Sequence, residues 1–157
     1  KKMRKFKCFL MVMVCVLFWN QNVYAADTGG SVVKNEKVYL NETCYLETVI
    51  IVYENNARAN GTKMGTKRVS YKADGNVMWY AEVTGTFEYD GTTSKCISAS
   101  VNAESLNSSW KIKSKSSSYT GNMAIGNVVA KQYYGIVAID TINETIELTC
   151  GADGTLS

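Results

Sequence analysis

The sequence contains no histidine and no proline among its 157 residues. The absence of histidine removes the Ser-His and Cys-His nucleophile pairs, the histidine general base and the commonest zinc ligand. The cysteines lie too far apart along the chain to form a zinc motif. We therefore expect no metal and no cofactor, and these patterns point to no catalytic residue.

The sequence also lacks an apolar run long enough to span a bilayer. Five positive charges precede the run CFLMVMVCVLFW at residues 8–19, whereas a membrane-spanning helix needs about 20 apolar residues. This layout is typical of a secretory signal peptide, and the residues around Ala25 predict cleavage after it. We expect residues 1–25 to be removed and the protein to be secreted, without a stable membrane anchor afterwards.

A basic stripe is missing once the predicted signal peptide is set aside. Residues 1–25 carry five of the 17 basic residues and none of the 14 acidic ones, which leaves 12 against 14 and a net charge of −2. Nucleic-acid binding needs a basic stripe or patch, and Lys111, Lys113 and Lys115 form only a short local cluster. We expect no nucleic-acid partner.

Alternation with a period of two is the strongest pattern that the chain does contain. From Trp79 to Tyr89 the odd positions hold aromatic, aliphatic or glycine residues, and the even positions after Tyr80 hold Glu or Thr. Such alternation is typical of a strand with one face in the core and one in water. Asp74-Gly75 and Asp90-Gly91 flank this predicted strand and are hairpin turn signals.

Short strands separated by turn signals continue to the C terminus. We expect strands at residues 67–73, 77–89, 110–115, 121–134, 136–141 and 145–150, and a last turn at Asp153-Gly154. Residues 37–55 fit a strand or a helix by periodicity, but β-branching in ETVIIVYENN favours a strand. Residues 56–65 are expected to form a loop.

These elements predict an all-β fold, an antiparallel β-sandwich or partly open barrel of about six to eight short strands. The length after the signal peptide suits one core and is too short for two domains. We expect the single β domain to cover residues 37–157, preceded by a flexible, Gly-rich lead at residues 26–36.

The strand pairing after Asp90-Gly91 is open between two registers. A two-residue turn would place Gly85 opposite Cys96, where a glycine would leave room for the sulfur of a second cysteine. The same register would place Ile97 on the polar face of the strand pair. A longer turn, or a bulge after Cys96, would place it on the opposite face. The sequence does not decide between the two.

Three cysteines follow the predicted cleavage site: Cys44, Cys96 and Cys150. An oxidising compartment favours at least one disulfide, and the odd count leaves one thiol over. Spacing alone does not choose among the three pairings, but Cys96 and Cys150 lie in well-formed strand patterns that could face each other across a core. On that pairing Cys44 is a free, buried thiol or a link between two molecules.

The chain resembles a group of small secreted proteins of Gram-positive bacteria, of uncharacterised function. The resemblance is carried by VTGTFEYDGTTSKC, by Trp110 and by the C-terminal ELTCGADGTLS, and it covers roughly residues 65–157. It implies a bacterial secreted β protein with a Cys96–Cys150 bond, and it carries over no catalytic residue. The segment with Cys44 lies outside it.

Paired carboxylates would be the remaining route to hydrolysis. A glycosidase needs two at about 5 to 9.5 Å, whereas Glu82 and Glu88 share a strand face but lie roughly 20 Å apart. Glu144 and Glu147 fall on opposite faces if their segment is a strand. A hydrolase that pairs carboxylates from different strands is the weakest of three functional hypotheses.

Aromatic side chains suggest a role in binding. Rings with nearby Asn, Ser and Thr are typical of faces that bind sugars or peptides. The leading hypothesis is a secreted, non-catalytic binding protein whose partner is cell-envelope polysaccharide, a host surface or another protein. A toxin-like or bacteriocin-like effector is the alternative. The candidates for an exposed binding face are Tyr80, Tyr119, Tyr133 and Tyr134, whereas Trp79, Phe87 and Tyr89 are expected in the core.

Overall fold

The computed structural model describes residues 30–53 and 61–157, so the predicted signal peptide lies outside the described residues. These residues form an all-β fold of eight antiparallel strands, as the sequence predicted. In the described part of the chain, no helix is long and apolar enough to cross a membrane. The strands are β1 (Ser31–Tyr39), β2 (Cys44–Tyr53), β3 (Gly61–Ala73), β4 (Asn76–Tyr89), β5 (Ser94–Ser105), β6 (Trp110–Thr120), β7 (Met123–Tyr134) and β8 (Val137–Thr149).

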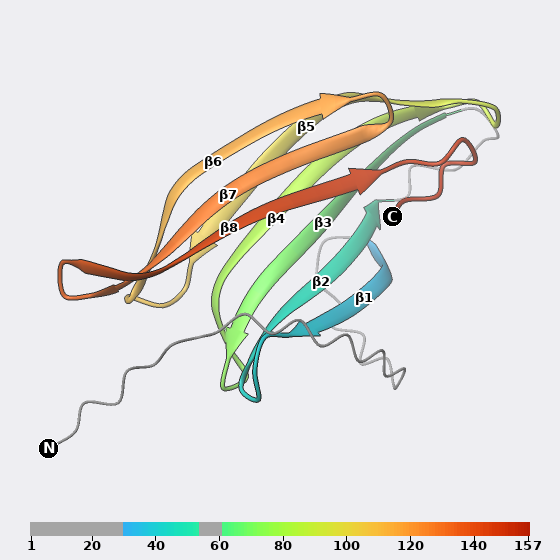
Figure 1. Cartoon of the computed structure of the whole chain (residues 1–157). Helices are drawn as coiled ribbons and strands as arrows, with labels where there is room; N and C mark the ends of the chain where they lie inside the picture. The colour runs from blue at the N-terminus through green and yellow to red at the C-terminus, as the bar shows by residue number, and fades with distance from the viewer. Residues whose placement is uncertain (1–29, 54–60) are drawn as a thin grey trace, which may run out of the picture.

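Two sheets pack face to face as a sandwich (Figure 1). The larger sheet has the order β1-β2-β3-β4-β5 and the smaller has the order β6-β7-β8, so the chain passes from one sheet to the other between β5 and β6. The smaller sheet contacts β3, β4 and β5, while β1 and β2 extend beyond it. The sandwich is therefore closed along β5 and β6 and open on the side of β1.

The inward face of β4 forms the centre of the core. Trp79, Val83 and Phe87 are fully buried, so the predicted alternation is confirmed. Trp110 brings a second indole from the smaller sheet, with 6.3 Å between the two ring centroids. Tyr71 of β3 packs against both rings, at 6.0 Å from Trp79 and 5.1 Å from Trp110. This aromatic cluster joins the two sheets, and each such ring pair adds about 0.5–1.5 kcal/mol beyond the buried area.

The turn after β4 is wider than a two-residue hairpin. Residues 90–93 connect β4 to β5, and Tyr89 pairs with Ser94. The carboxylate of Asp90 accepts hydrogen bonds from the backbone N–H groups of Thr92 and Thr93, at 2.8 Å and 2.7 Å. Asp favours turns because its side chain can bond the backbone in this way. Asp90-Gly91 therefore marks a turn, as predicted, but a longer one.

Gly85 and Cys96 are not opposite each other, so that sequence interpretation is wrong. Phe87 pairs with Cys96, and a bulge at Ile97 then places Gly85 opposite Ala99. This is the second of the two registers that the sequence left open. Gly85 makes room for an aromatic ring rather than for a sulfur, since a Cβ on Gly85 would lie 2.5 Å from the ring of Phe87.

The flexible lead predicted for residues 26–36 is wrong from Ser31 onward. Ser31 begins β1, which pairs with β2 as far as Tyr39 opposite Tyr45. All nine residues of β1 are exposed. The polar residues that suggested a flexible lead belong to an edge strand with no face in the core. Charged side chains on such an edge discourage pairing with other chains.

Other boundaries also differ from the prediction. The strand interpretation of residues 37–55 is confirmed for residues 37–39 of β1 and 44–53 of β2, whereas residues 40–43 connect the two strands and residues 54–55 lie outside the described residues. β3 begins at Gly61, so residues 61–65 of the expected loop are strand, and the rest of that loop, residues 56–60, is also outside the described part. The two strands predicted at residues 136–141 and 145–150 are one strand, β8. Asn143 and Glu144 do not break it because they continue the ladder opposite Val129 and Val128.

The last residues, 150–157, fold back onto the larger sheet, and we call them the C-terminal hook. The predicted turn at Asp153-Gly154 is confirmed, because the backbone N–H of Gly154 donates to the carbonyl of Gly151. Leu156 is buried and packs against Gly65 of β3. The ammonium group of Lys63 donates to the Gly154 carbonyl at 2.7 Å. The hook thus covers the end of the core beside β3.

Candidate functional site

The hairpin between β7 and β8 ends in apolar residues 134–139, which we call the apolar tip. Tyr134 pairs with Val137, and Gly135 adopts a positive φ of 62°, so a two-residue turn closes the hairpin. Ile136 occupies the second position of this turn, where Gly, Asn or Asp is usual. In Figure 1 the ribbon of this hairpin projects beyond the neighbouring strands. A large aliphatic side chain is therefore presented at the outermost point of the hairpin.

The large side chains of the apolar tip are in solvent. Ile136 is 97% exposed and Tyr134 is 82% exposed. Val137 and Ile139 follow at 61% and 58%. Single exposed apolar residues are normal on a protein surface, whereas a contiguous group marks a site of interaction.

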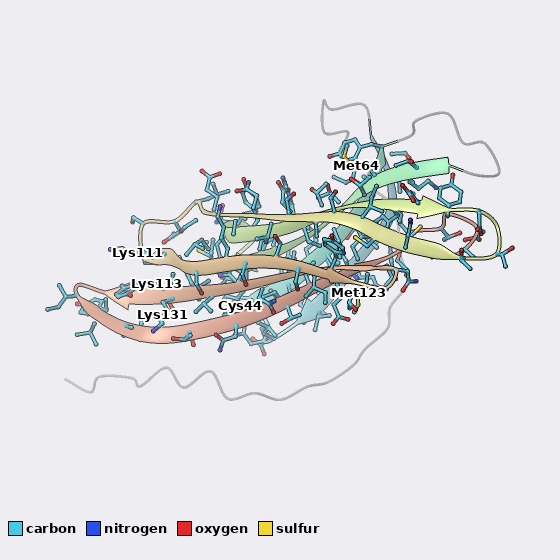
Figure 2. The ribbon with its side chains drawn as sticks, turned by 90° about the horizontal axis from the view of Figure 1, so that it is seen from above. Cys44, Met64, Lys111, Lys113, Met123 and Lys131 are labelled. Atoms are coloured by element: carbon cyan, nitrogen blue, oxygen red, sulfur yellow. The ribbon has the colours of Figure 1, made fainter. Side chains whose placement is uncertain are left out.

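Lysines surround the base of the apolar tip. Lys111 of β6 pairs directly with Lys131 of β7, and Lys113 is the bulged residue that follows on β6. Their Nζ atoms approach the ring of Tyr133, with Lys111 at 5.2 Å and Lys113 at 6.0 Å from its centroid, within cation–π range. Figure 2 shows the three lysines gathered at the end of the smaller sheet where β7 turns into β8. We call Lys111, Lys113 and Lys131 the basic collar.

No lysine of the basic collar forms an ion pair with a described residue. The ion pairs within residues 30–53 and 61–157 involve other lysines and Arg68, and none reaches a collar residue. The acidic residue closest to the tip in sequence, Asp140, accepts a hydrogen bond from the backbone N–H of Thr141. The end of the hairpin is therefore apolar at its extremity and positively charged behind it.

The four candidate tyrosines do not share one face. Tyr133 and Tyr134 both lie at the tip end of β7. Tyr119 is exposed but pairs with Ala124, nine residues from Tyr133 and thus about 30 Å away along β7. Tyr80 belongs to the larger sheet. Only Tyr133 and Tyr134 lie together.

Tyr80 is half-buried in a polar network on the outer face of the larger sheet. Its hydroxyl donates to the Glu104 carboxylate at 2.9 Å, and the Arg68 guanidinium lies 4.4 Å from its ring centroid. Arg68 also donates from Nε and Nη2 to Glu82, at 2.9 Å and 2.7 Å. Burial, together with the bond to Glu104, raises the pKa of Tyr80. Internal contacts therefore occupy both the hydroxyl and one face of this ring.

The apolar tip as a unit is the functional feature that sequence reasoning missed. The sequence predicts a separate strand at residues 136–141, and it presents Lys111 and Lys113 only as part of a basic cluster too short for nucleic acid. The signal that could have found the tip is the run YYGIVAI at residues 133–139. The residues on both sides of the turn glycine are apolar without alternation. A half-buried hairpin would instead alternate apolar and polar residues.

All three cysteines are free in the structure, so the predicted Cys96–Cys150 bond is not formed there. The structure does place the two thiols in one buried region. The backbone N–H of Cys96 donates to the carbonyl of Gly121 and that of Cys150 to the carbonyl of Asn122, so both flank the β6–β7 turn. Burial is the main cause that raises the pKa of each thiol. The bond stays a prediction for the oxidised protein.

Cys44 lies at the opposite end of the larger sheet. It pairs with Ala73, which pairs with Asn76 at the start of β4, whereas Cys96 pairs with Phe87 near the end of β4. The strand between Asn76 and Phe87 spans roughly 35 Å. A disulfide needs Cα atoms within about 7 Å. Within one folded molecule Cys44 therefore cannot bond to Cys96 or to its neighbour across the turn.

The acidic residues do not assemble a second candidate site. Within the described residues no group of three or more His, Cys, Asp or Glu could hold a metal ion. Glu82 forms an ion pair with Arg68, and Glu88 forms one with Lys95. Glu144 pairs with the buried Val128, so its side chain enters the space between the sheets, and burial raises its pKa. The two ion-paired glutamates are therefore occupied by basic partners within the fold.

Comparison with protein-family models, with curated proteins and with solved structures found no match. The candidate site therefore rests on geometry and chemistry alone. Its defining feature is the apolar tip backed by the basic collar.

Proposed function

We propose that this protein is a secreted, non-catalytic binding protein that engages its partner through the apolar tip. The observation that carries the proposal is the exposure of Tyr134, Ile136, Val137 and Ile139 at the end of a projecting hairpin. Burying a large apolar side chain is worth about 1.5–3 kcal/mol. A partner that covers the tip gains this free energy from several side chains at once.

The tip is pre-formed, which favours tight binding. β7 and β8 pair along their whole length, and Ala124, Val128 and Leu148 anchor the hairpin in the core. Because the hairpin is already ordered, binding loses little conformational entropy.

The chemistry around the tip supports binding without catalysis. Residues 134–139 contain no carboxylate, thiol or amine, and the one polar side-chain group is the hydroxyl of Tyr134. Catalysis by general acids and bases needs positioned titratable groups. The hydrolase alternative also lacks support from Glu82 and Glu88, since each already holds a basic partner.

Secretion is part of the same proposal. It is supported by the basic and then apolar N-terminal pattern of residues 1–19. In an oxidising environment the thiols of Cys96 and Cys150 are then expected to pair, since they flank the same turn. Intact-mass measurement of the protein recovered from the growth medium tests cleavage after Ala25.

Site-specific photo-crosslinking tests the role of the tip. A benzoylphenylalanine placed at position 136 of the chain from Ala26 to Ser157 is exposed to intact Gram-positive cells and irradiated. We expect covalent capture of a cell component by this probe. The matched control places the probe at Ile97, an exposed isoleucine on β5, which should capture none of it. Equal capture from both positions would contradict the proposal.

A toxin-like effector that acts on neighbouring cells is the second candidate. The same exposed tip favours it, because an effector also needs a docking element for its target cell. Purified protein added to growing Gram-positive strains should inhibit some of them, and a broad panel without inhibition would exclude this candidate.

A further inference from the structure

We infer that the partner of the apolar tip is a lipid bilayer with anionic headgroups, into whose surface residues 134–139 insert. The inference rests on the proposed function, since it names the partner of the same site. Its support comes from the shape of the tip, the order of side chains along the hairpin, and the charge behind it.

The shape of the tip suits a bilayer better than a protein. A standard protein interface buries about 800 Å² and about 20–30 residues on each partner. The apolar tip is the narrow end of a single hairpin and offers far fewer residues. A bilayer needs no matching concave surface, because lipid chains close around whatever enters them. A narrow, convex, apolar projection therefore fits lipid.

The order of side chains along the hairpin follows the polarity of a bilayer surface. Ile136 lies at the extremity, the rings of Tyr134 and Tyr133 come next, and Lys131 follows opposite Thr141. Lys131 lies four positions before Gly135, the first residue of the turn, which is about 13 Å along the strand. Interfacial elements bury their apolar groups about 5–10 Å deep, so Lys131 would remain at the headgroups. Tyrosine is enriched at this boundary.

The charge behind the tip complements anionic headgroups. Each lysine near an anionic membrane strengthens binding by about fivefold, the equivalent of about 1 kcal/mol. The chain after residue 25 has a net charge of −2, with 12 basic and 14 acidic residues, so the molecule as a whole is not attracted to such a surface. The basic collar reverses the sign locally, next to the tip. Attraction is therefore confined to the end of the molecule that can insert.

The backbone of the hairpin tolerates shallow insertion. An unpaired backbone group in lipid costs several kcal/mol in general, but Tyr134 and Val137 pair across the turn and Tyr133 pairs with Ala138. Backbone groups without strand partners remain at the two turn residues, at the bulged Ile139 and along the outer edge of β8, which is the edge strand of the smaller sheet. These groups cost free energy in lipid, so we expect the insertion to reach no deeper than the tip.

Vesicle binding tests the inference with the chain from Ala26 to Ser157. All buried hydrophobic residues of the described part lie between Ile50 and Leu156, so this chain keeps the whole core and omits the apolar run of residues 8–19. We expect it to co-sediment with vesicles of equimolar phosphatidylcholine and phosphatidylglycerol, and less with pure phosphatidylcholine. Added salt should weaken the binding, because it screens the collar.

Substitutions locate the contact. Ile136→Ser combined with Val137→Ser should weaken binding about tenfold or more, and Lys111→Gln should weaken it about fivefold. Tyr119→Ser is the matched apolar control, because Tyr119 is exposed on β6 at the opposite end of the smaller sheet. Lys115→Gln is the control for charge on β6. Both controls should bind as the unchanged chain does, and circular dichroism verifies that each variant is folded.

A fluorescence measurement reports insertion directly. Ile136→Trp places an indole at the extremity of the tip, and its emission should shift to the blue on binding vesicles and be quenched by brominated lipids. Tyr119→Trp should show neither effect.

The outcomes separate the two proposals. If vesicles do not bind, or the tip variants bind as well as the controls, the bilayer is not the partner. If at the same time the probe at position 136 captures a protein or polysaccharide from cells, the proposed function stands and only the membrane inference fails. If neither vesicles nor cell components engage the tip, both proposals fail.

Discussion

Gly85 lies where β4 of the larger sheet meets β7 of the smaller sheet. A Cβ at this position would lie 2.5 Å from the ring of Phe87 and 2.9 Å from the Cβ of Ala124. Real side-chain atoms do not approach so closely, so the sheets or the ring would have to move. The two sheets can therefore approach this closely only because residue 85 has no Cβ.

Gly85→Ala is expected to destabilise the protein by about 1–3 kcal/mol, because overpacking a dense core forces side chains from their preferred rotamers. Urea unfolding followed by circular dichroism measures the change. Ser98→Ala, on the exposed part of β5, is the control and should change stability by less than about 0.5 kcal/mol. Equal effects of the two substitutions would show that the core has room at Gly85.

Glu144 is the residue whose charge the fold disfavours. Burial between the sheets raises the pKa of its carboxyl above the ordinary value of 4.5, because desolvation penalises the charged form. A carboxyl with a raised pKa in the folded state adds stability that is fully present below the unfolded-state pKa. That stability is lost as the pH rises through the folded-state pKa.

Glu144→Gln should therefore raise the free energy of unfolding at pH 7, and the gain should disappear as the pH falls below 4.5. Urea titrations of both chains between pH 3 and pH 8 measure the difference at each pH. Glu147→Gln removes the same charge from an exposed position on β8 and should not reproduce the gain. A gain that persists at low pH would assign the effect to packing rather than to charge.

At the scale of elements, the sequence predicts strands well where one face is buried. β4 was predicted almost to its ends because burial imposes strict alternation. β1 was missed because an edge strand without a buried face has no such constraint. β8 was divided in two because Asn143 and Glu144 resemble a turn in isolation, although the ladder with β7 continues through them. Tertiary pairing overrides local signals in such cases.

Only part of the candidate site can be predicted from the sequence, for a related reason. The sequence predicts Tyr133 and Tyr134 as aromatic residues able to bind, and they lie at the site. It does not predict Ile136, Val137 and Ile139 as binding residues, because aliphatic residues in a strand are expected in the core. An aliphatic residue exposed for binding violates that rule, and only the geometry of the hairpin reveals it.

The β6–β7 turn lies between Cys96 and Cys150 and makes them the pair expected to oxidise. With oxidised glutathione, each thiol gives up one proton and one electron, and glutathione leaves as two thiols. We expect the intact mass to fall by two hydrogens and peptide mapping to join Cys96 to Cys150. In the chain-entropy model this loop of about 55 residues adds roughly 4 kcal/mol of stability.

Cys44→Ser is the control for this oxidation and should leave both the mass change and the added stability intact. Detection of Cys96 as a free thiol while Cys44 is paired would contradict the assignment.

At the scale of the whole molecule, the two sheets share one core. Trp79 comes from the larger sheet and Trp110 from the smaller, and Tyr71 packs against both. Neither sheet can therefore lose its structure without uncovering the other. A small domain with one shared core is expected to unfold in a single cooperative step.

Thermal or urea unfolding should show this cooperativity. Tryptophan fluorescence reports the contact between the sheets, and far-ultraviolet circular dichroism reports the strands themselves. We expect the two transitions to coincide at every denaturant concentration. A fluorescence transition that clearly precedes the loss of strand signal would mean that the sheets separate first and fold independently.

The C-terminal hook sets an order of events in time. Leu156 covers Gly65 of β3, and Lys63 donates to the carbonyl of Gly154, so the hook covers an end of the core that is built from residues much earlier in the sequence. The hairpins can form as soon as neighbouring strands are available, since nearly every strand pairs with the next in sequence. This end of the core nevertheless stays open until the C-terminal hook has reached β3. Docking of the hook is therefore the step that closes this end of the core.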